Sequence, residues 1–235
     1  MSRLHARRSV LAVGVSLALI LPIAAAAAPA ALASGSGRTT FVVLSRGDTG
    51  PRVALVQRAL SVKPVNGHFN DRTRHAVRQF QGARGIAVTG VVNSRTMNSV
   101  EAKWANIQAY RQHLRQKYHR IMQVARNQKG DPYVYGAAGP NAFDCSGYTM
   151  YVYAHATNIQ LQHLAGAQFR EGHQIHRKQA RPGDLVFMHS GSSIYHAAIY
   201  AGHNRVWEAS RPGTRIHRDR IWTNQVYFAR MFPKH

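Results

Sequence analysis

Between Ser94 and Lys129 the chain contains neither glycine nor proline, the residues that most often end helices. Apolar residues recur there at helical spacing, between faces rich in Arg, Gln and Lys; they are Trp104, Ile107, Leu114, Tyr118, Ile121 and Ala125. We predict one long helix or two abutting helices, about 50 Å long if unbroken. Residues 101–128 are then a helical linker between domains at 34–100 and 129–235, and its last turns pack on the second domain.

The first 33 residues have the pattern of a secretory signal peptide. The chain opens with three arginines, continues with an apolar run from Val10 to Ile23, and reaches small residues that end at Ala33. An uncleaved membrane anchor is the alternative, but no later run is apolar and long enough to span a bilayer. We therefore predict export by the Sec or the Tat route, with no stable membrane insertion after cleavage.

The chain is strongly basic along its whole length. It has 31 Lys and Arg against nine Asp and Glu, a net charge of +22, and loss of the signal peptide with its three arginines leaves +19. Such a field attracts polyanions but does not determine a fold. There is no compact Lys/Arg run, zinc-finger spacing or aromatic-basic RNA motif, so nucleic acid is not expected as a partner. Anionic wall polymers or an anionic membrane surface are the expected polyanions.

Residues 64–100 contain an internal repeat. The phrase NGHFNDRTRHAV, which begins at Asn66, returns as TGVVNSRTMNSV, which begins at Thr89. Each copy predicts a glycine turn, a helix cap and a helix start, because short polar side chains satisfy the free amides of a first turn. Upstream, GPRVALVQRAL predicts another helix, with Val53 and Val56 on its inner face.

These phrases resemble the small three-helix peptidoglycan-binding domain that is attached to cell-wall hydrolases. LSRGDTGPRVALVQRAL, NGHFNDRTRHAVRQFQ and GIAVTGVVNSRT carry the resemblance, which extends from Leu44 to Val100. It implies that residues 34–100 bind peptidoglycan in a shallow groove, and it does not identify the side chains in contact. The alternative is a helical domain that only packs against its neighbour.

Cys145 is the only cysteine in the chain. An exported protein with one cysteine cannot form an internal disulfide, so the thiol is inert core, half of an intermolecular bridge, or a reactive group. The stretch GDPYVYGAAGPNAFDCSGYTMYVYAHA passes from a loop rich in Gly and Pro into a helical pattern. Cys145 is therefore predicted at a helix N-terminus, where free amides and the helix dipole stabilise a thiolate.

A nucleophilic thiolate needs a base, and the chain has 14 histidines. LVFM and IYHAAIYAG predict neighbouring strands, with His196 at the start of the second. Glu208, in RVWEAS, falls on the predicted next strand, where a hairpin brings its carboxylate to the imidazole. His173 and His176 are spaced i, i+3, but no other ligand clusters near them, so we predict surface residues rather than a zinc site.

Residues 112–235 resemble the NlpC-type cell-wall cysteine endopeptidases, a papain-like group. The matching phrases are GDPYVYGAAGPNAFDCSGYTMYVY, LQHLAGAQFREG, RPGDLVFMHS and YHAAIYAGHNRVWEASRPG, in the order of the family. The resemblance implies an α+β fold, in which N-terminal helices and an antiparallel sheet form a papain-like catalytic domain. It implies that Cys145 is the nucleophile, His196 the base and Glu208 the third polar residue.

The same resemblance implies that Tyr133 helps to stabilise the oxyanion and that Asp144 and Ser146 shape the peptide site. Asp144 also fits a helix cap, and Tyr133 a core position. The implied reaction is hydrolysis of a peptidoglycan stem-peptide amide, typically γ-D-glutamyl to meso-diaminopimelate, by a secreted, wall-associated enzyme without cofactor or metal. The alternatives are a non-catalytic wall-binding scaffold and a thiol amidase or acyltransferase on the same fold.

Overall fold

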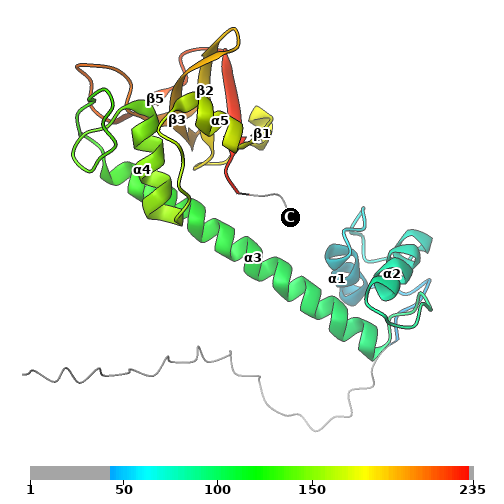
Figure 1. Cartoon of the computed structure of the whole chain (residues 1–235). Coiled ribbons are helices and arrows are strands. Elements are labelled where there is room, and N and C mark those ends of the chain that lie inside the picture. Colours follow the sequence, from blue (N-terminus) through cyan, green and yellow to red (C-terminus); the bar gives the residue numbers. More distant parts are fainter. Residues whose placement is uncertain (1–42, 233–235) are drawn as a thin grey trace, which may run out of the picture. The chain divides into compact units, whose positions relative to one another are not determined.

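A computed structural model describes residues 43–232, and the signal peptide predicted at residues 1–33 lies outside them. The described chain begins with two short helices and one long helix, and it continues with two more helices and a sheet (Figure 1). No helix in this range is both long enough and apolar enough to cross a membrane. The predicted α+β class, with helices ahead of an antiparallel sheet, is confirmed.

Three helices meet in the N-terminal part: α1 (Pro51–Ala59), α2 (Asp71–Ala83) and the first turns of α3 (Ser94–Asn127). Asn70 and Asn93 cap α2 and α3 as predicted, and each side-chain oxygen accepts the backbone N–H three residues on, at 3.0 and 2.9 Å. The helices enclose a small apolar core formed by Leu44, Val53, Val56, Ala59, Phe69, Val77, Phe80, Val92, Met97 and Val100.

A second repeated feature of this part is a pair of fully buried glutamines, Gln57 on α1 and Gln81 on α2. The oxygen of Gln81 accepts the N–H of Gly90 (2.9 Å), and its amide donates to the Val91 carbonyl (2.8 Å) and to the Thr96 hydroxyl (3.1 Å). Gln57 makes the equivalent bonds to Gly67, His68 and Thr73. Each glutamine therefore fixes the turn that leads into the next helix of the repeat.

The helix predicted between Ser94 and Lys129 is a single element, α3, of 34 residues. It runs without a break across the domain boundary that we predict at residue 100. Its first turns supply Met97 and Val100 to the N-terminal core, and its last turns supply Ile121 and Ala125 to the core of the C-terminal part. One element thus belongs to two hydrophobic cores.

The C-terminal part contains a six-stranded antiparallel sheet in the order β1-β6-β2-β3-β4-β5. The phrases LVFM, IYHAAIYAG and RVWEAS lie on adjacent strands, as predicted. The strands are β1 (His173–Ile175), β2 (Leu185–Ser190), β3 (Ser193–Gly202), β4 (Arg205–Glu208), β5 (His217–Arg220) and β6 (Val226–Arg230), and a 3-10 turn, Arg177–Gln179, follows β1.

Helices α4 (Cys145–Thr157) and α5 (Ala165–Glu171) precede the sheet in sequence, and both contact β3. Successive residues of β2 alternate between the two faces of the sheet, as strand geometry requires. Leu185 and Phe187 join the core that contains residues of α3 and α4, whereas Val186 and Met188 join a smaller cluster with Phe228. The buried hydroxyl of Tyr148 donates to the Ala125 carbonyl (2.9 Å) and so links α4 to the end of α3.

We predict that Gln81→Ala destabilises the N-terminal part by about 2–4 kcal/mol, because it leaves the N–H of Gly90 and the Thr96 hydroxyl without their buried partner and opens a cavity. Hydrogen exchange of the amides of α1 and α2 in the full chain measures this loss. Gln79→Ala, an exposed position on the same helix, is the matched control and should leave protection unchanged. Equal protection in both variants would show that the buried amide does not stabilise the repeat.

Candidate active site

Cys145 is the first residue of α4, and Asp144 is its N-cap. The Oδ1 atom of Asp144 accepts the Gly147 N–H at 2.7 Å, which satisfies one of the amides that a first turn leaves free. The loop therefore changes to helix at Asp144 because this side chain caps it. Cys145 lies at the positive end of the helix dipole, with its side chain half-buried.

Asp144 also joins three segments of chain around this turn. The Gly136 N–H donates to Oδ2 (3.0 Å), the Ser146 hydroxyl donates to Oδ1 (3.2 Å), and His163 Nε2 lies 2.9 Å from both carboxylate oxygens. The side chains of Asp144 and Ser146 are buried in this cap and do not line the cleft described below. Their predicted role in shaping the peptide site stays a prediction, and the contact that the structure gives them is with the helix start.

Gly147 allows the loop before the cysteine to lie directly against α4. A Cβ atom at this position would meet the Ala137 carbonyl oxygen at 2.2 Å and the Ala138 Cα at 2.9 Å. The Ala137 oxygen also accepts the Asp144 N–H at 2.7 Å. Any side chain at position 147 would push this loop away and disturb the backbone on which Cys145 sits.

His196 lies on β3 and Glu208 on the neighbouring strand β4, whose register is set by Ile199 opposite Trp207. The Nε2 atom of His196 is 2.8 Å from Oε2 of Glu208, and the two residues are 4% and 1% exposed. The hairpin that we predict between these strands thus brings the two side chains together. The bond fixes the ring orientation and leaves Nδ1 for a second partner.

That second partner is the Cys145 thiol, which is hydrogen-bonded to the His196 imidazole. Burial raises the pKa of Cys145, but the hydrogen bond and charge of His196, with a backbone hydrogen bond from Ala197, outweigh it, so the pKa lies below its ordinary value. Burial lowers the pKa of His196, whereas its bonds to Cys145 and Glu208 raise it to about 9. Both shifts favour a thiolate and imidazolium pair near neutral pH.

A cleft of about 420 Å³ opens over this pair. Its lining residues are Tyr133, Cys145, Tyr195, His196, Glu208, Ser210, Arg211, Thr214, His217, Asp219 and Trp222. Burial, and then the negative charges of Cys145 and Asp144, raise the pKa of Tyr133, so its phenol stays a hydrogen-bond donor at neutral pH. The cleft therefore contains a polarised thiol, an imidazole and a phenolic hydrogen-bond donor, which are groups that acyl transfer can use.

Several side chains of this region carry no prediction from the sequence, among them His163, Trp222, His217 and Asp219. His163 pairs with Asp144 although 18 positions separate it from Cys145, and nothing in its local pattern indicates that pairing. The Trp222 ring lies 5.5 Å from the His196 ring, and it reaches the cleft from the loop after β5. Within residues 43–232, one group could hold a metal: Glu208, His217 and Asp219. His173 and His176 are not part of it.

Comparison with known proteins identifies both parts of the chain. Residues 130–231 match the NlpC/P60 family, and residues 49–100 match the family described as "Putative peptidoglycan binding domain". The C-terminal part is an NlpC/P60 domain. The recognition of both parts from sequence motifs is therefore confirmed.

Named relatives match this chain over about 95 residues. "Probable endopeptidase p60" of Listeria monocytogenes is 43% identical over 95 residues, which are 40% of this chain and 19% of the relative. "Probable endopeptidase Cgl2188" of Corynebacterium glutamicum is 37% identical over 96 residues, 41% of this chain and 44% of the relative. The crystal structure of the NlpC/p60 domain of peptidoglycan hydrolase SagA is 33% identical, with a TM-score of 0.46 over 48% of this chain and 98% of that one. The chain thus spans less than half the length of these two curated relatives.

We predict that Cys145 of the NlpC/P60 domain reacts with a thiol-alkylating probe with a midpoint pH below the value of about 8.5 for a free cysteine. Because Cys145 is the only thiol, labelling of the full chain reports this site alone. His196→Ala removes the two larger causes that lower the pKa of Cys145 and leaves the burial that raises it, so the midpoint should move upward. His119→Ala, an exposed change on α3, is the control, and an identical midpoint in all three proteins would contradict the pairing.

Proposed function

We propose that the protein is a secreted, wall-associated peptidoglycan endopeptidase that uses Cys145 as nucleophile, His196 as base and Glu208 as the residue that orients His196. The observation that carries the proposal is the buried contact series from the Cys145 thiol through His196 to Glu208. A structural cysteine in a core needs no such series. The names of the two curated relatives, both probable endopeptidases, support the same class of reaction.

In the proposed reaction, the Cys145 thiolate attacks the amide carbon of a stem peptide in the cleft. The negative charge that develops on the carbonyl oxygen is met by the Cys145 backbone N–H, which the first turn of α4 leaves free, and by the Tyr133 hydroxyl. Protonated His196 then gives its proton to the leaving amine as the C–N bond breaks. Water, deprotonated by His196, attacks the thioester carbon, and the acid product leaves with the thiol restored.

Glu208 acts through His196 and not on the substrate. Its bond to Nε2 holds the imidazole with Nδ1 toward the thiol and stabilises the positive ring that exists before amine release. Because Glu208 is 1% exposed, its charge is screened little by water and acts strongly on the ring. A carboxylate at this place therefore fits a positioning role.

The proposed bond is the amide from γ-D-glutamate to meso-diaminopimelate, which the family resemblance implies. Both residues of that link carry carboxylates, and Arg211 lines the cleft as a positive side chain that can pair with one of them. Tyr195 and Trp222 line the cleft and are each 52% exposed, so this part of the cleft is accessible to a branched polymer substrate.

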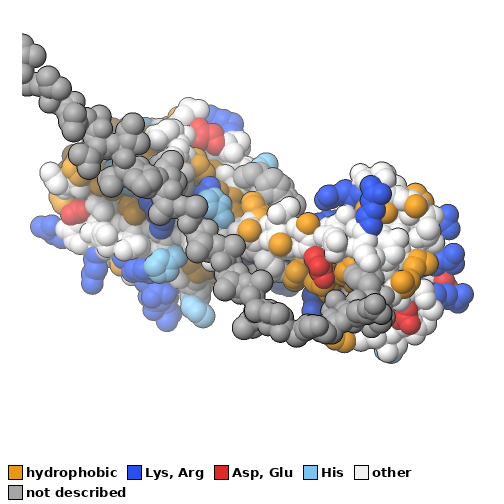
Figure 2. Space-filling view, turned by 90° about the horizontal axis from the view of Figure 1, so that it is seen from below, with side chains coloured by type: hydrophobic (Ala, Val, Ile, Leu, Met, Phe, Trp, Pro, Cys, Tyr) orange, Lys and Arg blue, Asp and Glu red, His pale blue; other side chains and the backbone are white. Residues whose placement is uncertain are grey.

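The N-terminal part is proposed to bring the enzyme to this substrate. Residues 49–100 match a peptidoglycan-binding family, which supports the wall polymer as the partner. Lys and Arg side chains lie at many separate points of the face in Figure 2, with few Asp and Glu. This charge fits broad attraction to anionic wall polymers better than it fits one specific docking patch.

We predict that the chain without its signal peptide cleaves peptidoglycan fragments and that mass spectrometry identifies products with a new free amine on diaminopimelate. Cys145→Ala should abolish this cleavage while binding to the sacculus persists. Loss of the nucleophile should lower turnover by a factor of about 10⁴ or more. Products joined to a second amine would indicate an acyltransferase instead. The absence of turnover by the native chain would support a binding scaffold and overturn the proposal.

We also predict that Glu208→Ala lowers turnover by a factor of about 10 to 100, which is less than the loss in His196→Ala. The reason is that Glu208 positions the base whereas His196 moves the proton. The comparison requires kcat for both variants under the same conditions. Glu171→Ala, an exposed change at the end of α5, serves as the control. Equal and complete losses from two folded proteins would assign Glu208 a more direct part in the chemistry.

A further inference from the structure

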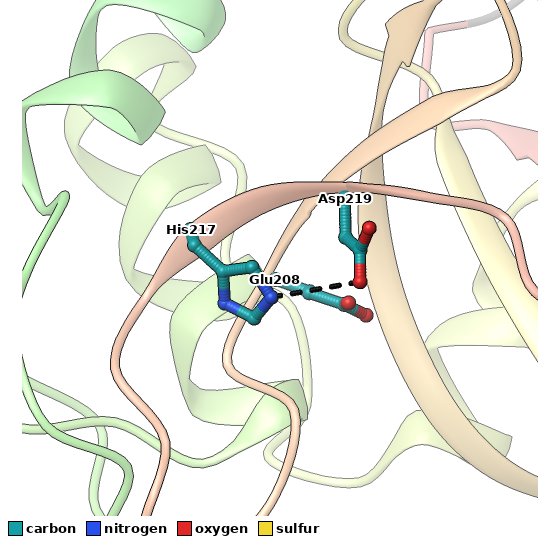
Figure 3. A group of neighbouring side chains, drawn as sticks. All are labelled: Glu208, His217 and Asp219. Atoms are coloured by element: carbon teal, nitrogen blue, oxygen red, sulfur yellow. Dashed lines mark ion pairs between the residues drawn. The ribbon is translucent and has the colours of Figure 1, made fainter.

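Three potential metal ligands converge beside the proposed catalytic residues, from strands β4 and β5. Glu208 lies opposite His217 in the register of these strands, and Asp219 follows His217 by two positions, so it projects from the same face of β5. Figure 3 shows the three side chains pointing toward one another. One ligand atom from each lies within 4.8 Å of the others.

His217 presents one of its ring nitrogens to Asp219 and uses the other for a backbone contact. Its Nδ1 atom lies 2.7 Å from the Arg215 carbonyl oxygen, which can only accept, so Nδ1 carries the hydrogen. In the neutral ring the lone pair is then on Nε2, which lies 3.7 Å from Asp219 Oδ2. Histidine ligands in metal sites commonly donate their other N–H to a carbonyl oxygen in this way, since the bond fixes tautomer and ring orientation.

Glu208 is the buried ligand among the three. Its Oε2 atom takes the bond from His196, and among residues 43–232 no other donor bonds to this carboxylate. Oε1 is therefore left for another cation, on a side chain that is 1% exposed and forms part of the cleft lining. No fully buried side-chain oxygen of residues 43–232 lacks a partner, so Oε1 is open to the cleft, where its negative charge attracts a cation.

The spacing of the three ligands fits one small ion. Ligands bound to Zn²⁺ at about 2.0–2.1 Å in a tetrahedral arrangement lie about 3.4 Å from each other. His217 Nε2 and Asp219 Oδ2 are 3.7 Å apart, too far for a hydrogen bond and slightly wider than this spacing. The His217 and Asp219 side chains are 42% and 54% exposed, so small rotations bring them in while Glu208 stays in place.

We propose that Glu208, His217 and Asp219 form a site for a divalent transition metal ion such as Zn²⁺, with the fourth position open to the cleft. One imidazole and two carboxylates suit a borderline ion of this kind better than Mg²⁺, which prefers oxygen ligands alone. The site shares Glu208 with the proposed catalytic residues, although the proposed reaction uses no metal.

Occupation of this site switches the enzyme off, a consequence that rests on the proposed function. The ion draws on the negative charge of Glu208, which would otherwise stabilise protonated His196, and it fills part of the cleft beside Cys145. Turnover is then high when the metal ion is scarce and low when it is abundant. The coupling is through Glu208, the one residue that belongs to both groups.

Titration of Zn²⁺ into the full Cys145→Ala chain, followed by calorimetry, tests the site without any need for turnover. The Cys145→Ala background is used because a thiolate next to an imidazole is itself a zinc ligand pair. We expect one site whose affinity falls at least tenfold in Asp219→Asn and in His217→Ala, and no comparable binding of Mg²⁺. His173→Ala, an exposed histidine on β1, is the matched control and should retain the affinity.

Unchanged Zn²⁺ affinity in Asp219→Asn would overturn the proposal. This variant keeps the shape of the side chain, so it decides the question even if His217→Ala fails to fold. A second measurement compares the inhibition of peptidoglycan cleavage by Zn²⁺ in the native chain and in Asp219→Asn, each relative to its own metal-free rate. Inhibition at the same Zn²⁺ concentration in both would refute the switch, while an inactive native chain would refute the proposed function and leave the binding result standing.

Discussion

The geometry around Cys145 depends on one carboxylate, that of Asp144. It caps α4 through the Gly147 N–H, holds the preceding loop through the Gly136 N–H, and pairs with His163 from the segment before α5. Cys145 follows it directly, so the position of the thiol is set by three contacts to a neighbour rather than by contacts of its own. A half-buried thiol must stay free to react, and its support therefore lies in the backbone on either side.

The electrostatics of the site follow from how deeply the second and third residues are buried. His196 and Glu208 are almost inaccessible, so the charged form of His196 depends on its bonds to Cys145 and Glu208 in a medium that solvates ions poorly. Burial alone would keep the thiol protonated and the imidazole neutral, and the hydrogen bonds among the three residues reverse both tendencies. Glu208 also lies beside His217 and Asp219 on β5, so the proposed catalytic and metal sites share one side chain.

The sequence predicts those features that depend on local pattern. The helix caps at Asn70 and Asn93, a helical segment between Ser94 and Lys129 and the strands that carry His196 and Glu208 all follow from residue type and spacing, although the pattern leaves one helix or two abutting helices open. The buried amide of Gln81 does not, because a glutamine between apolar positions of a helix has the same local pattern whether it is solvated or bonded to a turn 9 to 15 residues on. His163 is missed for a related reason, because its partner Asp144 lies 19 positions earlier in the sequence. His217 is missed because only the pairing of β4 with β5 places it opposite Glu208.

The continuity of α3 has a physical explanation in the location of its two ends. Residues from about 101 to 113 lie between the two cores and are largely exposed, and a free helix of that length would be marginal in water. Here the costly first turn is formed at Asn93, where the helix is capped and Met97 is buried, and the last turns are held by Ile121 and Ala125. The middle then only propagates a helix already fixed at both ends, and contacts such as Arg111 over the Trp104 ring add to it. A glycine or proline in this stretch would remove that advantage, which explains why an exposed connection is built without either residue.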